Sequence, residues 1–410
     1  MEISARLGMP PRETRVVGII CAGHFFSHFF LLLVPPLFPV LREIYGVGFT
    51  ELGFATACFS IASGFTQIPV GFMVDRYGAK KLLIWGLATE SIAICLIGVF
   101  PFYGALVMLM IAAGLSNSVF HPADYAILNA TVDKSRIGRI FSFHTFTGYL
   151  GDAVAPATIL VLASLFDWRV GMFVCGLLGL ITAGVMWANA GILDEAPATN
   201  AKQPDAAPGS KPALTGWALL FSLPILMGLL FFMVMSIANG GLRTFGVSAL
   251  HELYQTSLGE AGFVISIYLS VAPIGVLAGG WVVDRIKRQD IVAAVCILVI
   301  ATCVFAIAIF DPPLWGIGVL LAIAGFGNGF LAPSRDMIVR SLAPPGAIGS
   351  VFGFVSSGFA LAGIVAPVLY GWLLDHSDPR NVFWVSGFVA LITIVTVLGT
   401  GSVGRRAAAR

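Results

Sequence analysis

The chain has 410 residues, of which 58% are hydrophobic and only 11% are charged, and its mean hydropathy is +0.94. An average soluble domain has roughly 25% charged residues, so this composition excludes an ordinary cytosolic enzyme. The net charge of +2 gives no indication of a nucleic-acid partner. The apolar runs are continuous, whereas the strands of a transmembrane β-barrel alternate apolar and polar residues. We therefore predict an all-α polytopic membrane protein.

Turn residues and charge clusters divide the chain into twelve apolar segments, and a helix needs about 20 apolar residues to cross a bilayer. We predict two lobes of six spans each, over residues 1–190 and 215–410. Residues 191–214 between them are rich in proline, alanine and polar residues, a composition typical of a cytoplasmic linker. The predicted transmembrane helices are 16–40, 51–74, 81–100, 103–128, 139–163, 169–190, 217–249, 260–283, 291–310, 314–339, 348–373 and 381–402.

Most of the 23 basic residues lie at the termini and in alternate loops. The positive-inside rule then places both termini and the linker on the cytoplasmic side of the cytoplasmic (inner) membrane. This orientation requires an even number of spans, in agreement with twelve. The first loops to show the bias contain Arg76, Lys80 and Lys81, and then Lys134, Arg136 and Arg139.

The two halves of the chain are copies of one another. The segment LREIYGVGFTELG from Leu41 aligns with LHELYQTSLGEAG from Leu250, an offset of 209 residues. Further along, the offset becomes 211 and pairs Asn117 with Asn328. Copies with six spans each have the same topology, which is the parallel-repeat arrangement of a two-lobed transporter.

The loop after the second span has the pattern G-x-x-x-D-R-x-G-[RK]-[RK], and a shorter copy occurs in the second half. This pattern resembles the signature of the major facilitator superfamily. The resemblance implies two pseudo-symmetric lobes around a central cavity, with signature residues that lock the cytoplasmic side shut; the alternative is a solvated turn. The residues concerned are Gly71, Asp75, Arg76, Gly78, Lys80, Asp284 and Arg285.

Two further segments resemble fosmidomycin-resistance-type exporters within that superfamily. SVFHP, from Ser118, is similar to their fourth helix, and GYLGDAVAP, from Gly148, to their fifth. This resemblance implies export of a drug-like compound or metabolite. The chain has no Walker loop that would bind ATP, no CxxC pair and no clustered histidine boxes. We therefore expect no cofactor, no resident metal and no enzyme activity.

Ionisable side chains at mid-bilayer cost roughly 2.5–3.5 kcal/mol on insertion scales, so those present should face protein or water. His24 and His28 are four residues apart and thus share one face of the first helix. We predict that they bind substrate, although two neutral histidines hydrogen-bonded across a helix interface would give the same pattern. Arg243 could instead snorkel outward. The predicted substrate ligands are His24, His28, Asn117, His121, Arg243 and Asn328.

A second group of residues is predicted to carry protons or to gate the cavity. Asp124 and Arg335 are repeat mates of opposite charge, which suggests an inter-lobe pair. The alternative is that each pairs within its own lobe, for example Arg335 with Asp336. Asp152, a lone carboxylate in the fifth helix, is a candidate proton carrier. The full group is Asp124, Asp152, His144, Arg335 and Asp336.

The sequence thus predicts a monomeric secondary active transporter, coupled to protons, that moves a small organic solute across the lipid bilayer. Export is favoured over uptake of a small organic anion or carboxylate. Metal-ion transport through His24, His28, His121 and Asp124 is a further alternative. The last alternative is a membrane scaffold or receptor that transports nothing.

Overall fold

The computed structural model describes residues 9–134, 136–193, 216–283, 285–344 and 347–408. Within these ranges every regular element is a helix, and twelve helical segments are long and apolar enough to cross a membrane. The prediction of an all-α protein with twelve transmembrane helices is confirmed. From residue 194 onward, the predicted linker over 191–214 lies outside the described residues.

The first six spans begin and end close to their predicted positions, but two of them are interrupted. Pro35 and Pro36 start a short 3₁₀ turn in the first span, because proline lacks the N–H that would continue an α-helix. The fourth span breaks after Asn117. The elements are α2 (Pro11–Leu31), η1 (Pro35–Leu37), α3 (Phe38–Tyr45), α4 (Phe49–Tyr77), α5 (Ala79–Val99), α6 (Tyr103–Asn117), α7 (Phe120–Thr131), α8 (Ile137–Leu165), α9 (Trp168–Ala188) and η2 (Ala190–Ile192).

In the second half, the predicted seventh span is divided into a short helix and a long one. Proline in the first turn of the long helix sets its start, where a missing N–H costs nothing. The elements are α10 (Gly216–Leu220), α11 (Leu223–Tyr254), α12 (Leu258–Val283), α13 (Gln289–Phe310), α14 (Leu314–Leu342), α15 (Ile348–His376) and α16 (Asn381–Ala408).

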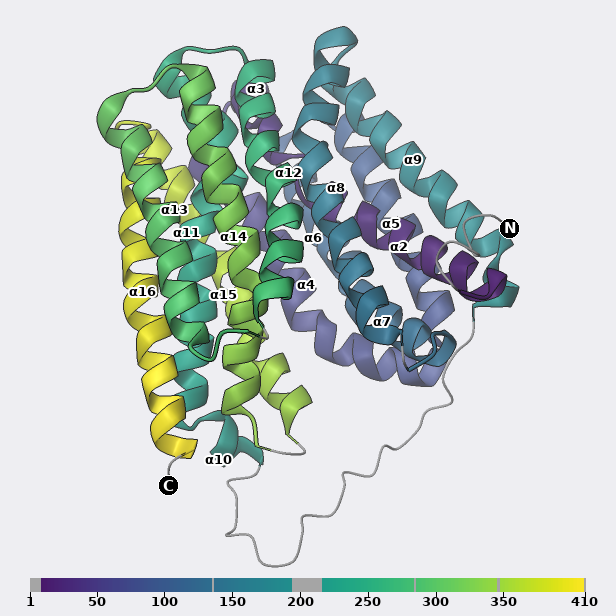
Figure 1. Cartoon of the computed structure of the whole chain (residues 1–410). Coiled ribbons are helices and arrows are strands. Elements are labelled where there is room, and N and C mark those ends of the chain that lie inside the picture. The colour runs from purple at the N-terminus through teal and green to yellow at the C-terminus, as the bar shows by residue number, and fades with distance from the viewer. Residues whose placement is uncertain (1–8, 135, 194–215, 284, 345–346, 409–410) are drawn as a thin grey trace, which may run out of the picture. The chain divides into compact units, whose positions relative to one another are not determined.

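Contacts divide the chain into two units, residues 1–199 with 257–266 (unit 1) and residues 200–256 with 267–410 (unit 2). In unit 1, α2 packs against α8, and α5 packs against α6 and α9. In unit 2, α11 packs against α15, and α13 packs against α14 and α16 (Figure 1). The first helix of each unit thus packs on the fifth, and the third packs on the fourth and sixth, as a duplication requires.

A pair of glycines shows the duplication at the level of single contacts. A Cβ atom on Gly114 of α6 would collide with the carbonyl oxygen of Phe59 in α4. A Cβ atom on Gly325 of α14 would likewise collide with the carbonyl oxygen of Tyr268 in α12. The two contacts are related by the same offsets of 211 and 209 residues that align the sequence. Glycine therefore allows the same close helix approach in both units.

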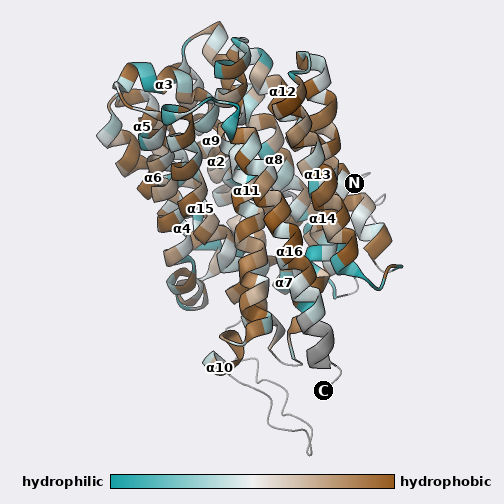
Figure 2. Ribbon diagram, turned by 90° about the vertical axis from the view of Figure 1, so that its left-hand side faces the viewer, coloured by the Kyte–Doolittle hydropathy of each residue, from teal (hydrophilic) through white to brown (hydrophobic). Residues whose placement is uncertain are grey.

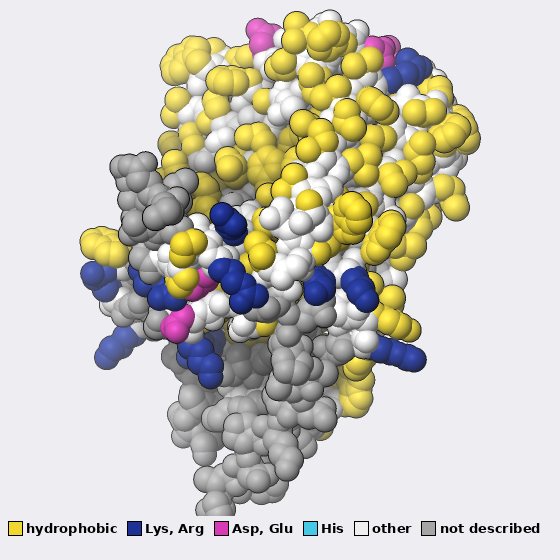
Figure 3. All heavy atoms as spheres, turned by 90° about the vertical axis from the view of Figure 1, so that its right-hand side faces the viewer, with side chains coloured by type: hydrophobic (Ala, Val, Ile, Leu, Met, Phe, Trp, Pro, Cys, Tyr) yellow, Lys and Arg dark blue, Asp and Glu magenta, His cyan; other side chains and the backbone are white. Residues whose placement is uncertain are grey.

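The outer surfaces of the helices are strongly apolar. Trp187, Trp281 and Trp315 are among many large hydrophobic side chains that are exposed. Figure 2 shows hydrophobic residues along most of the helix lengths, and hydrophilic residues mainly near the helix ends. In Figure 3 lysine and arginine side chains gather in a band below a largely hydrophobic face. This distribution fits helices surrounded by lipid, with their ends in the interfaces.

Candidate functional site

Four histidines and two aspartates come together inside unit 1. They lie on α2, α7 and α8, at positions where each helix crosses the membrane region. We call this set the histidine cluster; its members are His24, His28, His121, Asp124, His144 and Asp152.

Asp124 is at the centre of the cluster and is completely buried. Its Oδ2 atom lies 2.9 Å from Nε2 of His144 and 3.3 Å from Nδ1 of His24. The two imidazole rings stack with centroids 3.6 Å apart. Oδ1 of Asp124 has no hydrogen-bond partner among the described residues. The contact with His144 is a hydrogen bond, whereas Nδ1 of His24 lies close to the same oxygen but has no hydrogen-bond partner among the described residues.

A second histidine–carboxylate pair lies beside the first. Nδ1 of His28 is 3.2 Å from Oδ2 of Asp152, and the ring centroid of His28 is 4.8 Å from that of His24. His28 is 28% exposed, whereas Asp152 is buried. The prediction that Asp152 is a lone carboxylate is therefore wrong, because α2 and α8 pack so that His28 faces it. This pair connects the buried cluster with a partly exposed side chain.

His121 lies at the edge of the cluster, with its ring centroid 5.4 Å from that of His24. It is exposed, and its ring stacks on Tyr125 one turn later in α7. The break between α6 and α7 starts a new helix just before His121, so that His121 and Asp124 both project from its first turns. Tyr125 is not among the predicted site residues, because nothing in the local sequence distinguishes it from a packing aromatic residue.

Gly148 allows the histidines of α2 to lie against α8. A Cβ atom at this position would be 2.8 Å from Nε2 of His24 and 2.9 Å from Cδ2 of His28. Any larger residue at position 148 would therefore push both rings away.

A separate polar network in unit 1 surrounds Glu90, which is fully buried on α5. The amide nitrogen of Asn117 donates to Oε1 of Glu90 at 3.0 Å and to the carbonyl oxygen of Ser27 at 3.2 Å. Ser63 donates to Oδ1 of Asn117 at 3.5 Å. These bonds engage both ends of the Asn117 amide and join α2, α4, α5 and α6. The contacts favour a packing role for Asn117, which we predicted as a substrate ligand.

The histidine cluster can hold a proton or a metal ion. A neutral imidazole can donate one N–H bond to the shared carboxylate, and an imidazolium can donate two. His24, Asp124 and His144 each also offer one ligand atom, and these atoms lie within 4.8 Å of one another. Two imidazole nitrogens and a carboxylate oxygen form a set that zinc and similar ions accept.

In unit 2, three side chains form a polar triad near the middle of their helices: Asn239 of α11, Tyr268 of α12 and Asn328 of α14. The amide nitrogen of Asn239 donates to Oδ1 of Asn328 at 2.9 Å, and the Tyr268 hydroxyl donates to Oδ1 of Asn239 at 3.0 Å. Of the three, only Asn328 is a predicted ligand. The signal for the other two is in the repeat, since their mates are Phe30 and Phe59.

The predicted gating residues of unit 2 lie nearby in sequence. Nε of Arg335 donates to Oδ1 of Asp336 at 2.9 Å, and its guanidinium lies 5.1 Å and 5.2 Å from the ring centroids of Phe232 and Phe359. Asp124 and Arg335 thus each have a partner within their own unit. This is the alternative pairing, and an inter-lobe pair stays a prediction. Arg243 lies one turn after Asn239 and is half-buried.

The predicted conformational lock is described only in part. α4 ends at Tyr77 and is followed by Gly78, whose φ of +93° favours glycine. The Arg76 guanidinium lies 5.3 Å from the ring centroid of Tyr77, and that of Arg285 lies 4.2 Å from the ring centroid of Trp281. Nothing lies within 4 Å of a Cβ atom placed on Gly71. Lys80 is the second residue of α5, and the Asp75 side chain and Asp284 lie outside the described residues.

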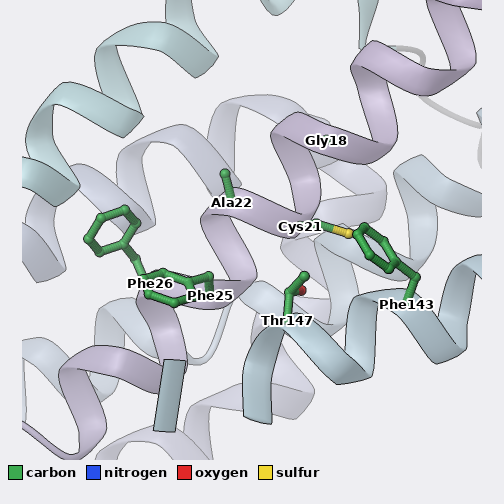
Figure 4. Close-up of a pocket in the computed structure, with 7 residues that line it drawn as sticks. All are labelled: Gly18, Cys21, Ala22, Phe25, Phe26, Phe143 and Thr147. Carbon is green, nitrogen blue, oxygen red and sulfur yellow. The ribbon is translucent and has the colours of Figure 1, made fainter. Parts of the chain in front are cut away.

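An apolar hollow of about 320 Å³ lies beside the histidine cluster, between α2 and α8 (Figure 4). Cys21 in its wall is one turn from His24, and the Thr147 hydroxyl donates to the carbonyl oxygen of His144 at 2.8 Å. The hollow suits an apolar group, because three phenylalanine side chains and small, mostly apolar residues form its wall. Its lining residues are Gly18, Cys21, Ala22, Phe25, Phe26, Phe143 and Thr147.

Comparison with known proteins connects this architecture with transporters. The chain is 24% identical to the fosmidomycin resistance protein of Escherichia coli (strain K12) over 93% of this chain and 92% of that protein. It is 24% identical to the D-galactonate transporter of Escherichia coli O6:H1, over 89% and 90%. It is 23% identical to the hexuronate transporter of Bacillus subtilis, over 88% of each chain.

Solved structures show the same fold. An inward-facing, occupied bacterial homolog of the human lysosomal transporter Spinster matches with a TM-score of 0.75 at 13% identity, over 97% of both chains. The nucleoside transporter NupG matches with a TM-score of 0.75 at 15% identity, over 95% of this chain and 98% of that one. The family model described as Major Facilitator Superfamily matches residues 20–253 and 235–408. The chain belongs to the Major Facilitator Superfamily and is a multi-pass membrane transporter.

Proposed function

We propose that the chain is a proton-coupled secondary transporter that exports a small organic solute across the cytoplasmic membrane. It works as a monomer with both termini in the cytoplasm, and exchanges solute for protons by alternating access. The histidine cluster of unit 1 is the observation that carries this proposal. Glu90 is a further buried carboxylate among the described residues of unit 1, and its hydrogen bond from Asn117 favours a packing role.

The charge balance of the cluster supports a proton site. With Asp124 ionised and His24 and His144 neutral, the three groups together carry one negative charge. Burying such a charge costs several kcal/mol unless it is compensated, and one added proton neutralises it. His28 and Asp152 form a second group of the same kind, with His28 reaching partial exposure. Protons can therefore pass between a buried acceptor and a more accessible histidine.

The export direction is supported by the similarity to the fosmidomycin resistance protein, which extends over nearly the whole chain. The segments that resemble such exporters include two members of the cluster, His121 and Asp152.

Uptake of a small organic anion is the second candidate function. Two observations favour it: Arg243 and Arg335 both lie inside spans of unit 2, and the relatives include transporters named for D-galactonate and hexuronate. Arginine binds carboxylates through two parallel hydrogen bonds. A proton gradient would drive such an anion inward by symport rather than outward by exchange.

The test is solute flux in liposomes that contain the purified protein, with and without an imposed pH gradient. Fosmidomycin, D-galactonate and glucuronate are the probes. We expect the gradient to drive at least one of them, and Asp124→Asn to reduce this driven flux at least tenfold. His376→Gln is the matched control, because His376 is an exposed histidine at the end of α15.

Each outcome decides between the alternatives. Solute movement opposite to the proton flow identifies exchange and export. Solute movement in the same direction as the proton flow identifies symport and uptake. Gradient-driven flux that Asp124→Asn leaves unchanged would refute the role of the cluster. Absence of flux for all three organic probes, together with Zn²⁺ uptake, would support metal-ion transport instead. No flux of any probe would favour a scaffold or receptor.

A further inference from the structure

The duplication has left the two units with different chemistry at matching positions. At the offset of 209, His24 and His28 correspond to Met233 and Ile237. At the offset of 211, Asp124 corresponds to Arg335. The other cluster positions are apolar or glycine in unit 2, since Ala332, Val355 and Gly363 replace His121, His144 and Asp152. Unit 2 therefore lacks the proton site of unit 1.

Unit 2 has gained neutral hydrogen-bonding groups where unit 1 has aromatic rings. Asn239 and Tyr268 of the polar triad correspond to Phe30 and Phe59. Tyr268 is almost completely buried, and Gly325 brings α14 directly against its backbone. Its hydroxyl is therefore held in place to orient the Asn239 amide, which in turn orients Asn328.

Asn117 and Asn328 occupy equivalent positions in the two repeats, but their side-chain amide groups differ in their hydrogen bonds. In unit 1 the Asn117 amide nitrogen donates to Glu90 and Ser27. The residues of unit 2 that correspond to Glu90, Val299 to Ala301 according to the offset, are all apolar. Oδ1 of Asn328 accepts from Asn239, and no residue in the described part of the chain accepts from its amide nitrogen. Asn328 thus keeps two N–H donors for another acceptor.

The surroundings of these donors are polar and include a positive charge. Asn239, Arg243 and Asn328 are each partly exposed near the middle of a span. Lipid tails offer no hydrogen bonds, so groups of this kind face water or protein. Arg243 follows Asn239 by four residues and therefore projects from the same side of α11. An oxygen-rich anion fits donors and a cation in this arrangement.

We propose that the polar triad of unit 2 binds the transported solute, and that this solute is a small organic anion whose oxygen atoms accept from Asn328. Arg243 adds positive charge on the same face. This inference rests on the proposed transport function and assigns solute binding to unit 2 and proton binding to unit 1. The triad also explains why one Asn of the repeat pair is structural and the other is not.

The test is thermal unfolding of the purified full-length protein with three matched pairs of compounds: gluconate and sorbitol, lactate and 1,2-propanediol, glycolate and ethylene glycol. Each pair differs in one carboxylate. We expect at least one acid to raise the unfolding temperature while its polyol does not. Asn328→Leu should weaken the binding of that acid at least tenfold, because the charged oxygen atoms of the solute lose the hydrogen bonds that Asn328 donates.

Asn328→Asp provides a second variant that preserves the internal contact, since its carboxylate still accepts from Asn239 but has no N–H to donate. Asn328→Asp should weaken the binding of the acid by at least as much as Asn328→Leu does. Thr302→Val is the matched control, because the Thr302 hydroxyl donates within its own helix, to the carbonyl oxygen of Leu298.

Three results would overturn the inference: equal shifts for acids and polyols, no shift with any acid, or unchanged affinity in both Asn328 variants. Failure of the transport proposal gives a different result. In that case acid binding would depend on Asn328, but liposomes would show no solute flux under any gradient. Conversely, gradient-driven flux with an unchanged half-saturation in Asn328→Asp would refute only the solute site.

Discussion

At the scale of single residues, glycines at the end of α4 provide the sharpest contrast. Gly78 has φ of +93° and ψ of +135°, a region that side chains with a Cβ atom avoid. Gly71 lies inside the helix, and the space that a Cβ atom would take there is open. Both belong to the family signature, yet only one of them has a backbone that requires glycine.

We expect Gly78→Ala to lower the free energy of unfolding by about 1–3 kcal/mol, the usual cost of a strained backbone conformation. Gly71→Ala should be neutral or slightly stabilising, since alanine favours a helix interior. Unfolding temperatures of the two purified variants would check this. Equal effects would show that the signature glycines serve some other purpose than backbone geometry.

All six members of the histidine cluster were predicted from the sequence, but their contacts with one another were not. His24, Asp124 and His144 were predicted because polar groups are costly inside a membrane. Their mutual contacts depend on which faces of α2, α7 and α8 meet, and helical periodicity alone does not determine this. For the same reason the pairing of His28 with Asp152 was missed. Asn239 and Tyr268 could have been found by comparing the repeats position by position.

At the scale of helices and their connections, the Glu90 network joins four helices of unit 1. Glu90→Gln keeps an oxygen that accepts from Asn117, so we expect folding and gradient-driven flux to be retained. Glu90→Ala removes that acceptor inside the unit and should cost about 1–3 kcal/mol. Thermal unfolding and liposome flux would be measured together. Loss of proton coupling in Glu90→Gln would mean that Glu90 takes part in proton transfer.

A second connection joins the start of α2 to the residue before α8. Arg136 donates from Nη2 to Oε2 of Glu13 at 2.9 Å and from Nε to Oε1 at 3.3 Å. These hydrogen bonds raise the pKa of Arg136 above its usual value. A group with a raised pKa stabilises the fold below that value and stops doing so only above it. The contact should therefore persist throughout the neutral and alkaline range used with proteins.

Accordingly, Glu13→Gln should lower the unfolding temperature by the same amount at pH 7 and pH 9. Glu43→Gln, at an exposed position of α3, should have little effect at either pH. A Glu13→Gln effect that disappears at pH 9 would show that the arginine loses its proton there, contrary to the raised pKa.

At the scale of the whole molecule, the helix count and the repeat followed directly from the sequence, because twelve apolar segments and two constant offsets are long-range patterns.

The orientation in the membrane depends on the distribution of charge. In cells, a membrane-impermeant maleimide should label Phe166→Cys without permeabilisation and Lys134→Cys only after it. Unmodified protein is the control, since five of its six cysteines are buried. The reverse pattern would place the termini outside.

The central claim is that unit 1 couples protons and unit 2 binds solute. Its most direct test compares solute exchange at equal pH with pH-driven accumulation, in liposomes containing Asp124→Asn or Asn328→Asp. We predict that Asp124→Asn retains exchange but loses accumulation. Asn328→Asp should raise the half-saturation concentration of both processes at least tenfold and keep the number of protons moved per solute. Loss of exchange in Asp124→Asn, together with unchanged half-saturation in Asn328→Asp, would contradict the account.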